Sequence, residues 1–576
     1  MLHVQTTPRR VPPQSLLTRG EPRAASLIRT ACRLLVVGWN LVVTPSLAAD
    51  EAVDEQTNVS EAESLASELQ FINPLYAGQD PYLTRFAGDY VQAVSERIGR
   101  RGALVVYRSP SLLDQGTARV VYTAPATGRF SRELWAPEIH RLGGKWFIYA
   151  CADDGDNANH RLIVLQGSSD DPQGEFHFAK ELATPGWAID ATVFEHPDGR
   201  LFCLWSGWPD GFAPDSTQHL FISAMRSPTE LSGQAVDISG TMYEWEKVER
   251  PAGLNEGPQA LLRDGKLLVV YSASGSWTAD YCLGLLECDL NRLLDARAWH
   301  KLPRPLFSRS ADVYGPGHCC FVKSPDDSQD WIVYHSSVDR EGSWRRCVSA
   351  KPFTWDAAGR PNFGSPLSWG VATPAPSGEP RPNIDAAVAL HFENQDRDQL
   401  QEFIPPGHRG ARLANNAYHF RAPVASNGLE VKSLVRGVSY DDAQVVASLK
   451  LQRGDCAGIL FRVGVCAVGE NRWSGYLARL CELDGSHRTL ELVACDGRSL
   501  TTLATTHVDA SPTREMELRV DFQDDRLRVF VDAGETPALE ASDRRFIGGR
   551  VGMLSLDSDV DFHRLRIGPP QTPPGE

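Results

Sequence analysis

Three acidic residues stand in similar surroundings within the first half of the 576-residue sequence. Asp80 and Glu256 each stand beside glycine and proline residues, and Asp190 lies in an apolar stretch. Hydrolysis of a glycosidic bond with inversion needs a carboxylic acid to protonate the departing oxygen and an opposed carboxylate to activate water. These residues could supply both groups.

A turn-capping carboxylate is the plain alternative for any one of the three acids. That alternative weakens if all three recur at equivalent places of a repeated unit, because independent turn caps have no reason to keep one register. The elements that carry the acids therefore decide between the two interpretations.

Four short apolar segments have the composition of strands, and each follows a turn-like or polar segment. They are Lys145–Ala150, Leu201–Trp205, Lys266–Tyr271 and Trp331–His335. A stretch with a distinctive polar residue precedes each of them, and a fifth such stretch surrounds Asp80. These stretches are 78–81, 135–140, 189–192, 255–258 and 314–318.

Five degenerate copies spaced by about 45 to 65 residues are typical of a five-bladed β-propeller. A two-sheet sandwich is the alternative, but a polar residue at the start of every unit favours radial symmetry. The first strand of each blade lines the central channel, so the polar residues would converge on one axis. The sequence thus predicts an all-β protein with a propeller over residues 71–372.

A proline-rich linker at 373–384 separates this region from a second β domain, predicted over 385–568. Leu518, Val520 and Phe522 alternate with charged residues, which favours an antiparallel, jelly-roll-like β-sandwich. Trp473 and Tyr476 could form a sugar-stacking platform there or belong to its core. Residues 569–576 are predicted to be a disordered tail.

The first 49 residues combine arginines, an apolar run at 34–43 and small residues at 44–49, as in a secretory signal. A buried helix is the alternative. The interpretation predicts a secreted or periplasmic protein with no membrane span after signal removal, because ten apolar residues are too few to cross a bilayer. Residues 50–70 are predicted to be a linker.

The formal net charge of −15 argues against nucleic-acid or anionic-membrane partners and fits a neutral polymer. None of the 12 cysteines has the spacing of a zinc site, and most lie in apolar contexts where a free thiol is a small core residue. A bridge between Cys282 and Cys288 stays open.

With these motifs assembled, the propeller resembles glycoside hydrolase family 43 across nearly all of residues 71–370. The matching pieces are Asn73-Pro74, Asp80-Pro81, Trp135–His140, Ile189–Thr192, Trp245–Val248, Asn255–Pro258, Tyr271–Ser274, Tyr314–His318 and Trp355–Pro361. The resemblance implies that Asp80 is the general base and Glu256 the general acid, while Asp190 tunes and orients that acid. The two catalytic carboxyl carbons of an inverting enzyme should then lie about 6.5–9.5 Å apart.

Three residues are candidates for substrate binding: Trp135, which could form an apolar floor for the sugar, and His318 and Arg346, which the resemblance suggests. A core tryptophan, a structural histidine and a surface arginine are the respective alternatives, and Arg345 could take the place of Arg346. The expected partner is an oligo- or polysaccharide. No cofactor is required and no metal ligand is predicted, although a structural cation could lie in the channel near His318.

Within the family, Tyr271–Ser274, Tyr281–Leu286 and Tyr314–His318 resemble exo-acting α-L-arabinofuranosidases. The second domain resembles concanavalin-like or laminin-G-like sandwiches in general pattern. The expected activity is release of terminal α-L-arabinofuranosyl units by an inverting glycoside hydrolase. The alternatives are a β-xylosidase, an endo-arabinanase, or a non-catalytic carbohydrate-binding propeller.

Overall fold

The computed structural model describes residues 69–249, 251–406, 408, 411–421, 428–482, 487–509 and 514–570. The predicted signal region, nearly all of the predicted linker at 50–70, and residues 571–576 of the predicted tail lie outside this range. Within it, no helix is long and apolar enough to cross a membrane.

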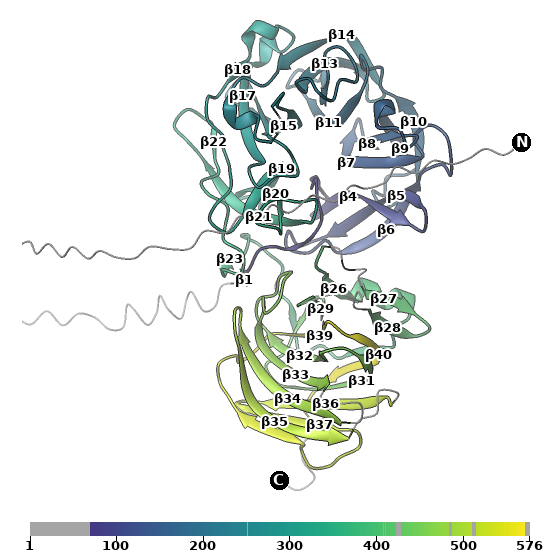
Figure 1. The fold of residues 1–576 in the computed structure, drawn as a ribbon, viewed down its shortest axis with the longest axis vertical. Coiled ribbons are helices and arrows are strands. Elements are labelled where there is room, and N and C mark those ends of the chain that lie inside the picture. The colour runs from purple at the N-terminus through teal and green to yellow at the C-terminus, as the bar shows by residue number, and fades with distance from the viewer. Residues whose placement is uncertain are drawn as a thin grey trace, which may run out of the picture. The chain divides into compact units, whose positions relative to one another are not determined.

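Five antiparallel sheets form the blades of a propeller, drawn in purple to teal in Figure 1. Blade 1 contains β3 (Leu83–Phe86), β4 (Asp89–Ile98), β5 (Arg101–Ser109) and β6 (Thr117–Thr123). Blade 2 contains β7 (Arg132–Leu142), β8 (Lys145–Asp153), β9 (Arg161–Gly167) and β10 (Phe176–Glu181). Blade 3 contains β11 (Ala188–Glu195), β12 (Leu201–Gly207), β13 (His219–Ser227) and β14 (Glu230–Ser239).

Blade 4 contains β15 (Asn255–Arg263), β16 (Lys266–Ala273), β17 (Cys282–Asp289) and β18 (His300–Lys301). Blade 5 contains β19 (Tyr314–Lys323), β20 (Asp330–Ser337) and β21 (Arg346–Trp355), with β22 (Pro361–Asn362) paired to β21. Its fourth strand is β2 (Tyr76–Ala77), which precedes blade 1 in the chain and so closes the ring. β1 (Gln70–Phe71) pairs with β23 (Thr373–Pro374).

The predicted strand segments are confirmed as the second strands of blades 2 to 5, namely β8, β12, β16 and β20. Two of the tight turns before them consist of residues with positive φ, Gly143-Gly144 and Asp264-Gly265. Two such residues in succession make the type I′ turn whose twist matches an antiparallel hairpin. Short 3₁₀ segments lie in the connections: η1 (Asn157–Asn159), η2 (Glu244–Glu246), η3 (Leu290–Arg292), η4 (Ala296–Ala298) and, beyond the propeller, η5 (Asn394–Gln399).

The hydrophobic core of the propeller lies between neighbouring blades. One buried cluster joins Leu104 of blade 1 to Trp146 of blade 2, and another joins Phe202 of blade 3 to Tyr271 of blade 4. Equivalent clusters fill the other three interfaces. Each blade therefore holds its neighbours in place through apolar contact, which fixes the positions of the innermost strands around the axis.

The innermost strands of blades 2 to 5 contain β-bulges, seen as register shifts against the second strand: one in blades 3 and 4, and two in blades 2 and 5. Each of these strands has a left-handed residue at a bulge: Ala136 (φ 41°), Asp190 (φ 56°), Gly257 (φ 53°) and His318 (φ 40°). Asp80 adopts the same conformation (φ 49°) just before β3. A bulge re-aims a side chain relative to a regular strand.

This repeat corrects one expectation about the acids. Asp80 and Asp190 occupy equivalent left-handed positions, but in blade 4 that position belongs to Gly257. Glu256 stands one residue earlier, so the three acids are not strictly in register.

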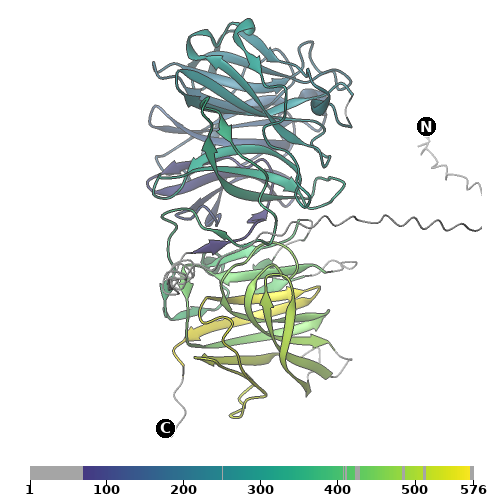
Figure 2. The same cartoon turned by 90° about the vertical axis from the view of Figure 1, so that its left-hand side faces the viewer.

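A β-sandwich follows, coloured green to yellow in Figures 1 and 2. One sheet contains β25 (Val388–Leu390), β27 (Ala411–Ala414), β28 (Ala417–Phe420), β31 (Ala443–Arg453), β36 (Met516–Gln523), β37 (Arg526–Val531), β38 (Leu539–Ser542) and β40 (Asp559–Gly568). The other contains β26 (Leu400–Phe403), β29 (Glu430–Val435), β32 (Cys456–Val463), β33 (Ser474–Glu482), β34 (His487–Asp496), β35 (Leu500–Asp509) and β39 (Arg550–Leu556). β24 (Asn383–Ile384) pairs in parallel with β30 (Val438–Ser439).

Trp473 and Tyr476 are fully buried in this domain. The Tyr476 hydroxyl donates a hydrogen bond to the Asp543 carboxylate at 2.6 Å. Both aromatic side chains therefore belong to the core, and the interpretation of them as a sugar-stacking platform is wrong.

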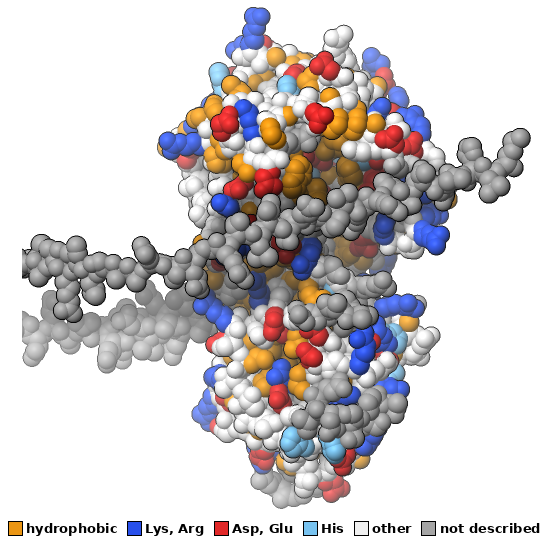
Figure 3. Space-filling model, viewed as in Figure 1, with side chains coloured by type: hydrophobic (Ala, Val, Ile, Leu, Met, Phe, Trp, Pro, Cys, Tyr) orange, Lys and Arg blue, Asp and Glu red, His pale blue; other side chains and the backbone are white. Residues whose placement is uncertain are grey.

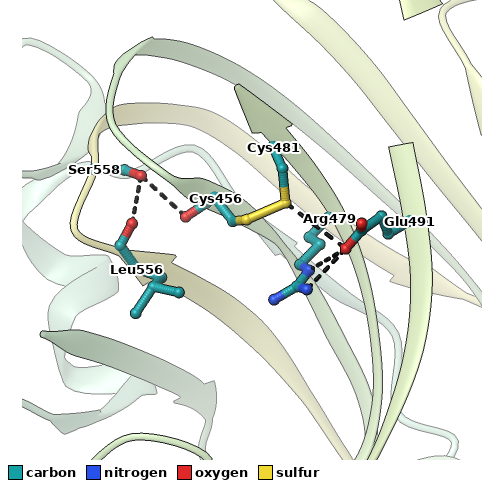
Figure 4. Close-up of a disulfide and its surroundings, with 6 residues drawn as sticks. All are labelled: Cys456, Arg479, Cys481, Glu491, Leu556 and Ser558. Atoms are coloured by element: carbon teal, nitrogen blue, oxygen red, sulfur yellow. Dashed lines mark hydrogen bonds and ion pairs between the residues drawn. A yellow bond between two sulfur atoms is a disulfide. The ribbon is translucent and has the colours of Figure 1, made fainter. Parts of the chain in front are cut away.

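One disulfide joins Cys456 and Cys481, which face each other on β32 and β33 (Figure 4). The other nine described cysteines are free and buried, as expected for small core residues. Cys282 and Cys288 are among them, so the open question of a bridge between them is answered in the negative.

The Cys456→Ser/Cys481→Ser variant should lose about 2–4 kcal/mol of unfolding free energy, because the cross-link restricts the unfolded chain. Urea unfolding of the full chain, followed by circular dichroism, measures the difference. A reducing agent should lower the wild-type midpoint toward that of the variant and leave the variant unchanged. Coincident curves for the two oxidised proteins would contradict the expectation.

Candidate active site

Asp80 lies in a cationic environment built mainly by blade 5. Its Oδ1 is 3.2 Å from His318 Nδ1 and 3.8 Å from Arg346 Nη1. Burial by itself raises the pKa of Asp80, but His318, His335 and Arg346 together hold that pKa well below its usual range. The Asp80 carboxylate is therefore ionised, as a base must be.

Two histidines beside Asp80 differ in charge. Burial lowers the pKa of His318, but Asp80, Asp190 and Glu256 outweigh burial and raise it overall. Burial and then Arg346 lower the pKa of His335 to about 3. His335 is thus neutral, and its Nδ1 accepts the backbone N–H of Asp80 at 3.0 Å.

Asp190 is a buried carboxyl group, 8% exposed, whose Oδ2 accepts the backbone N–H of Gly257 at 3.0 Å. Burial raises its pKa to about 7; His318 opposes the rise, while Glu256 and Asp80 add to it. Asp190 therefore changes its protonation state near neutral pH. The Gly257 hydrogen bond ties it to the residue next to Glu256.

Glu256 is bound by uncharged donors. The Tyr281 hydroxyl donates to its Oε1 at 2.8 Å, and the Gln218 side-chain amide donates to its Oε2 at 3.3 Å. The Tyr281 ring stacks on His335, with centroids 5.7 Å apart. A side chain at Gly317 would come within 2.2 Å of the Tyr281 ring, so only glycine leaves room for this tyrosine.

A repeated contact between blades holds the inward-facing residues. Ser206 on β12 donates to the backbone oxygen of Asn255 at 2.7 Å, and Ser272 on β16 accepts the backbone N–H of His318 at 2.8 Å. His335 on β20 binds Asp80 in the same manner. In each case a side chain on the second strand of one blade bonds the backbone of the next blade, at or within two residues of its left-handed position.

Trp135 and Arg346 line a cavity of about 370 Å³ together with Asp80. Trp135 stacks on His160 at 4.0 Å, and buried Arg346 lies beneath Trp344, which is 63% exposed. The lining does not include Asp190, Glu256 or His318.

The two candidate arginines differ in burial and in partner. Arg346 is 5% exposed and points toward Asp80, whereas Arg345 is half-exposed and pairs with Asp339 at 3.1 Å.

Sequence reasoning missed His335 and Gln218 as members of this site, and it noted Tyr281 only as part of a motif. His335 and Gln218 lie on or beside the second and third strands of their blades, where apolar strand patterns carry no signal for a polar site. Only the blade-to-blade contacts reveal them.

Over the described residues, no group of three or more His, Cys, Asp or Glu side chains could hold a metal ion. His318 Nδ1 is already engaged by Asp80. A cation near His318 therefore stays a prediction.

On the molecular face drawn in Figure 3, acidic and basic side chains are interspersed over the propeller, with apolar side chains between them. Such a surface fits an uncharged substrate better than a polyanion.

The chain is similar to several known arabinofuranosidases. The chain is 36% identical over 282 residues to the extracellular exo-α-(1→5)-L-arabinofuranosidase of Streptomyces chartreusis, covering 47% of this chain and 83% of that protein. It is 33% identical over 319 residues to the enzyme of the same name from Streptomyces avermitilis, covering 53% and 65%. A solved α-L-arabinofuranosidase from Lactobacillus brevis aligns at 30% identity and a TM-score of 0.48, covering 52% and 98%.

Residues 71–361 match the glycosyl hydrolases family 43, and this range contains all the acids of the site. The match spans half of the chain and coincides with the described blades. The chain therefore belongs to glycosyl hydrolases family 43.

Proposed function

We propose that this chain releases terminal α-L-arabinofuranosyl units by inverting hydrolysis, with Asp80 as general base and Glu256 as general acid. The observation that carries the assignment is the contrast between the two carboxyl groups. Asp80 faces cations that keep it ionised, whereas Glu256 is held by the neutral Tyr281 and Gln218.

In the proposed reaction, water attacks the anomeric carbon while Asp80 accepts a proton from that water. Glu256 gives its proton to the glycosidic oxygen as the bond to the sugar breaks. Asp80 ends protonated and Glu256 ends as an anion. Glu256 contributes to the raised pKa of Asp190, and the hydrogen bond from Gly257 to Asp190 orients the backbone next to the acid.

The choice of sugar is supported by the named relatives, two of which are described as extracellular exo-α-(1→5)-L-arabinofuranosidases. Their description also supports secretion of this chain. Trp135, Arg346 and the exposed Trp344 around the cavity are suited to pack against and hydrogen-bond a sugar.

Incubation with α-1,5-linked arabino-oligosaccharides should release single L-arabinose units, and proton NMR should show the inverted anomer first. Xylobiose and aryl β-D-xyloside are the matched comparison substrates. Xylose as the main product would indicate a β-xylosidase, and longer oligomers from linear arabinan would indicate an endo-arabinanase. Binding without turnover would indicate a carbohydrate-binding propeller.

Glu256→Gln should reduce cleavage of arabinobiose by about 10²- to 10⁴-fold, the usual contribution of a general acid. It should cost far less on a nitrophenyl arabinofuranoside, because that phenolate departs without a proton. Asp80→Asn should reduce both activities by similar factors, since a good leaving group cannot replace the activated water. Selective rescue of Asp80→Asn, not Glu256→Gln, by the aryl substrate would reverse the two assignments.

His318→Gln should move the acidic limb of the kcat/KM profile to higher pH. His318 lowers the pKa of Asp80, and activity needs the Asp80 anion, so loss of the imidazolium raises the pH at which that anion forms. The shift should be about one pH unit or more, as for loss of a neighbouring opposite charge. His196→Gln, which changes a histidine paired with Asp198, is the control and should leave the limb in place. An unmoved limb in His318→Gln would contradict the proposed electrostatics.

A further inference from the structure

A buried ion pair lies behind the acid side of the site. Glu246 is fully buried and the Lys301 side chain is 3% exposed, with Nζ and Oε1 2.6 Å apart. The second oxygen of Glu246 accepts the backbone N–H groups of Met242 and Tyr243 at 2.6 and 2.8 Å. Burial alone raises the pKa of Glu246, but Lys301 and these donors hold it below its usual value, so Glu246 is ionised. Burial lowers the pKa of Lys301, and Glu246 opposes that shift.

Both charges converge on the side chain of Asn255. Its amide nitrogen donates to Glu246 Oε1 at 2.9 Å, and its amide oxygen accepts from Lys301 Nζ at 2.9 Å. The hydroxyl of Tyr271 supplies a further hydrogen bond to Glu246 Oε1 at 3.0 Å. An amide held between an anion and a cation has one favoured orientation. A flip would place the amide NH2 against the lysine ammonium and the amide oxygen against the glutamate carboxylate.

The backbone of Asn255 is held as firmly as its side chain. Its N–H donates to the Gln218 carbonyl at 3.0 Å, and its carbonyl accepts from Ser206 Oγ at 2.7 Å. The Gln218 side chain bonds both Ser206 Oγ and Glu256 Oε2. Glu256 follows Asn255 in the chain, and the Gln218 side chain connects this network to the Glu256 carboxylate.

A buried ion pair often adds no more to the free energy of unfolding than well-packed apolar residues of similar volume would. Stability alone therefore does not explain why this pair is present. We propose that Glu246 and Lys301 are positioning residues, which act through Asn255 to aim the Glu256 carboxyl at the departing oxygen. This inference rests on the proposed acid role of Glu256. It predicts a defect confined to substrates that need that acid.

The sandwich offers a matched control. Lys432 is fully buried, and its Nζ binds Glu430 Oε1 at 2.6 Å and a backbone carbonyl, that of Gly469, at 2.7 Å. Lys301 makes the same two kinds of contact at the same distances, to Glu246 and to the Gly240 carbonyl. Neutralising each pair removes a buried ion pair of equal kind, once beside the acid and once in the other domain.

The experiment compares Glu246→Gln/Lys301→Met with Glu430→Gln/Lys432→Met in the full chain. The first variant should lose about 10- to 100-fold in kcat on arabinobiose, as for a misaimed catalytic group, with KM little changed. On the nitrophenyl substrate it should keep activity within about threefold, because that step needs no proton. The control variant should retain wild-type kcat on both substrates.

Equal losses on both substrates, or no loss, would overturn the inference.

Tyr271→Phe removes only one hydrogen bond to Glu246 and provides the test if the double variant does not fold. It should also lose more activity on arabinobiose than on the nitrophenyl substrate, but by a smaller factor. An equal effect on both substrates there would likewise reject positioning. Glu256→Gln, assayed in parallel, separates the two ideas: if it shows no substrate split, the proposed acid role itself fails.

Discussion

A left-handed residue at the start of the innermost strand in each blade is the constraint on which the site depends. A regular strand sends successive side chains to opposite faces, so it cannot bring a carboxylate onto the axis without disturbing the blade interfaces. In blades 2 to 5 bulges break that alternation, and in blade 1 Asp80 takes the same left-handed conformation just before β3. Aspartate tolerates the left-handed region better than most residues, which suits Asp80 and Asp190 to these places.

Blade 4 uses the same bulge differently. Gly257 takes the left-handed position, and its free N–H reaches Asp190 in the neighbouring blade. Glu256 is displaced by one residue and approached by Tyr281 and Gln218. The same backbone feature thus gives three carboxyl groups different surroundings: cations beside Asp80, burial around Asp190, and neutral donors on Glu256. Different surroundings are what allow one carboxyl group to act as an acid and another as a base.

The blades are also chemically interdependent. Second-strand residues of blades 3, 4 and 5 bond the backbone of the next blade close to its left-handed residue. The first of these contacts is to Asn255, whose side chain binds the Glu246–Lys301 pair. β2 completes blade 5 immediately before the chain reaches Asp80. The strand that closes the ring therefore also places the proposed base. The position of Asp80 consequently depends on a correctly closed propeller.

The sequence by itself determined the repeat and the all-β class, and it singled out Asp80, Asp190 and Glu256 as candidate acids, because turn residues, strand periodicity and short motifs are local properties of the chain. It also singled out His318 and Arg346. Tertiary structure alone decided that His335, Tyr281 and Gln218 reach these acids, that Arg346 and not Arg345 faces Asp80, and that Glu256 lies one place out of register. Such contacts join strands of different blades, and their strength depends on burial and angle, which no local pattern of residues encodes.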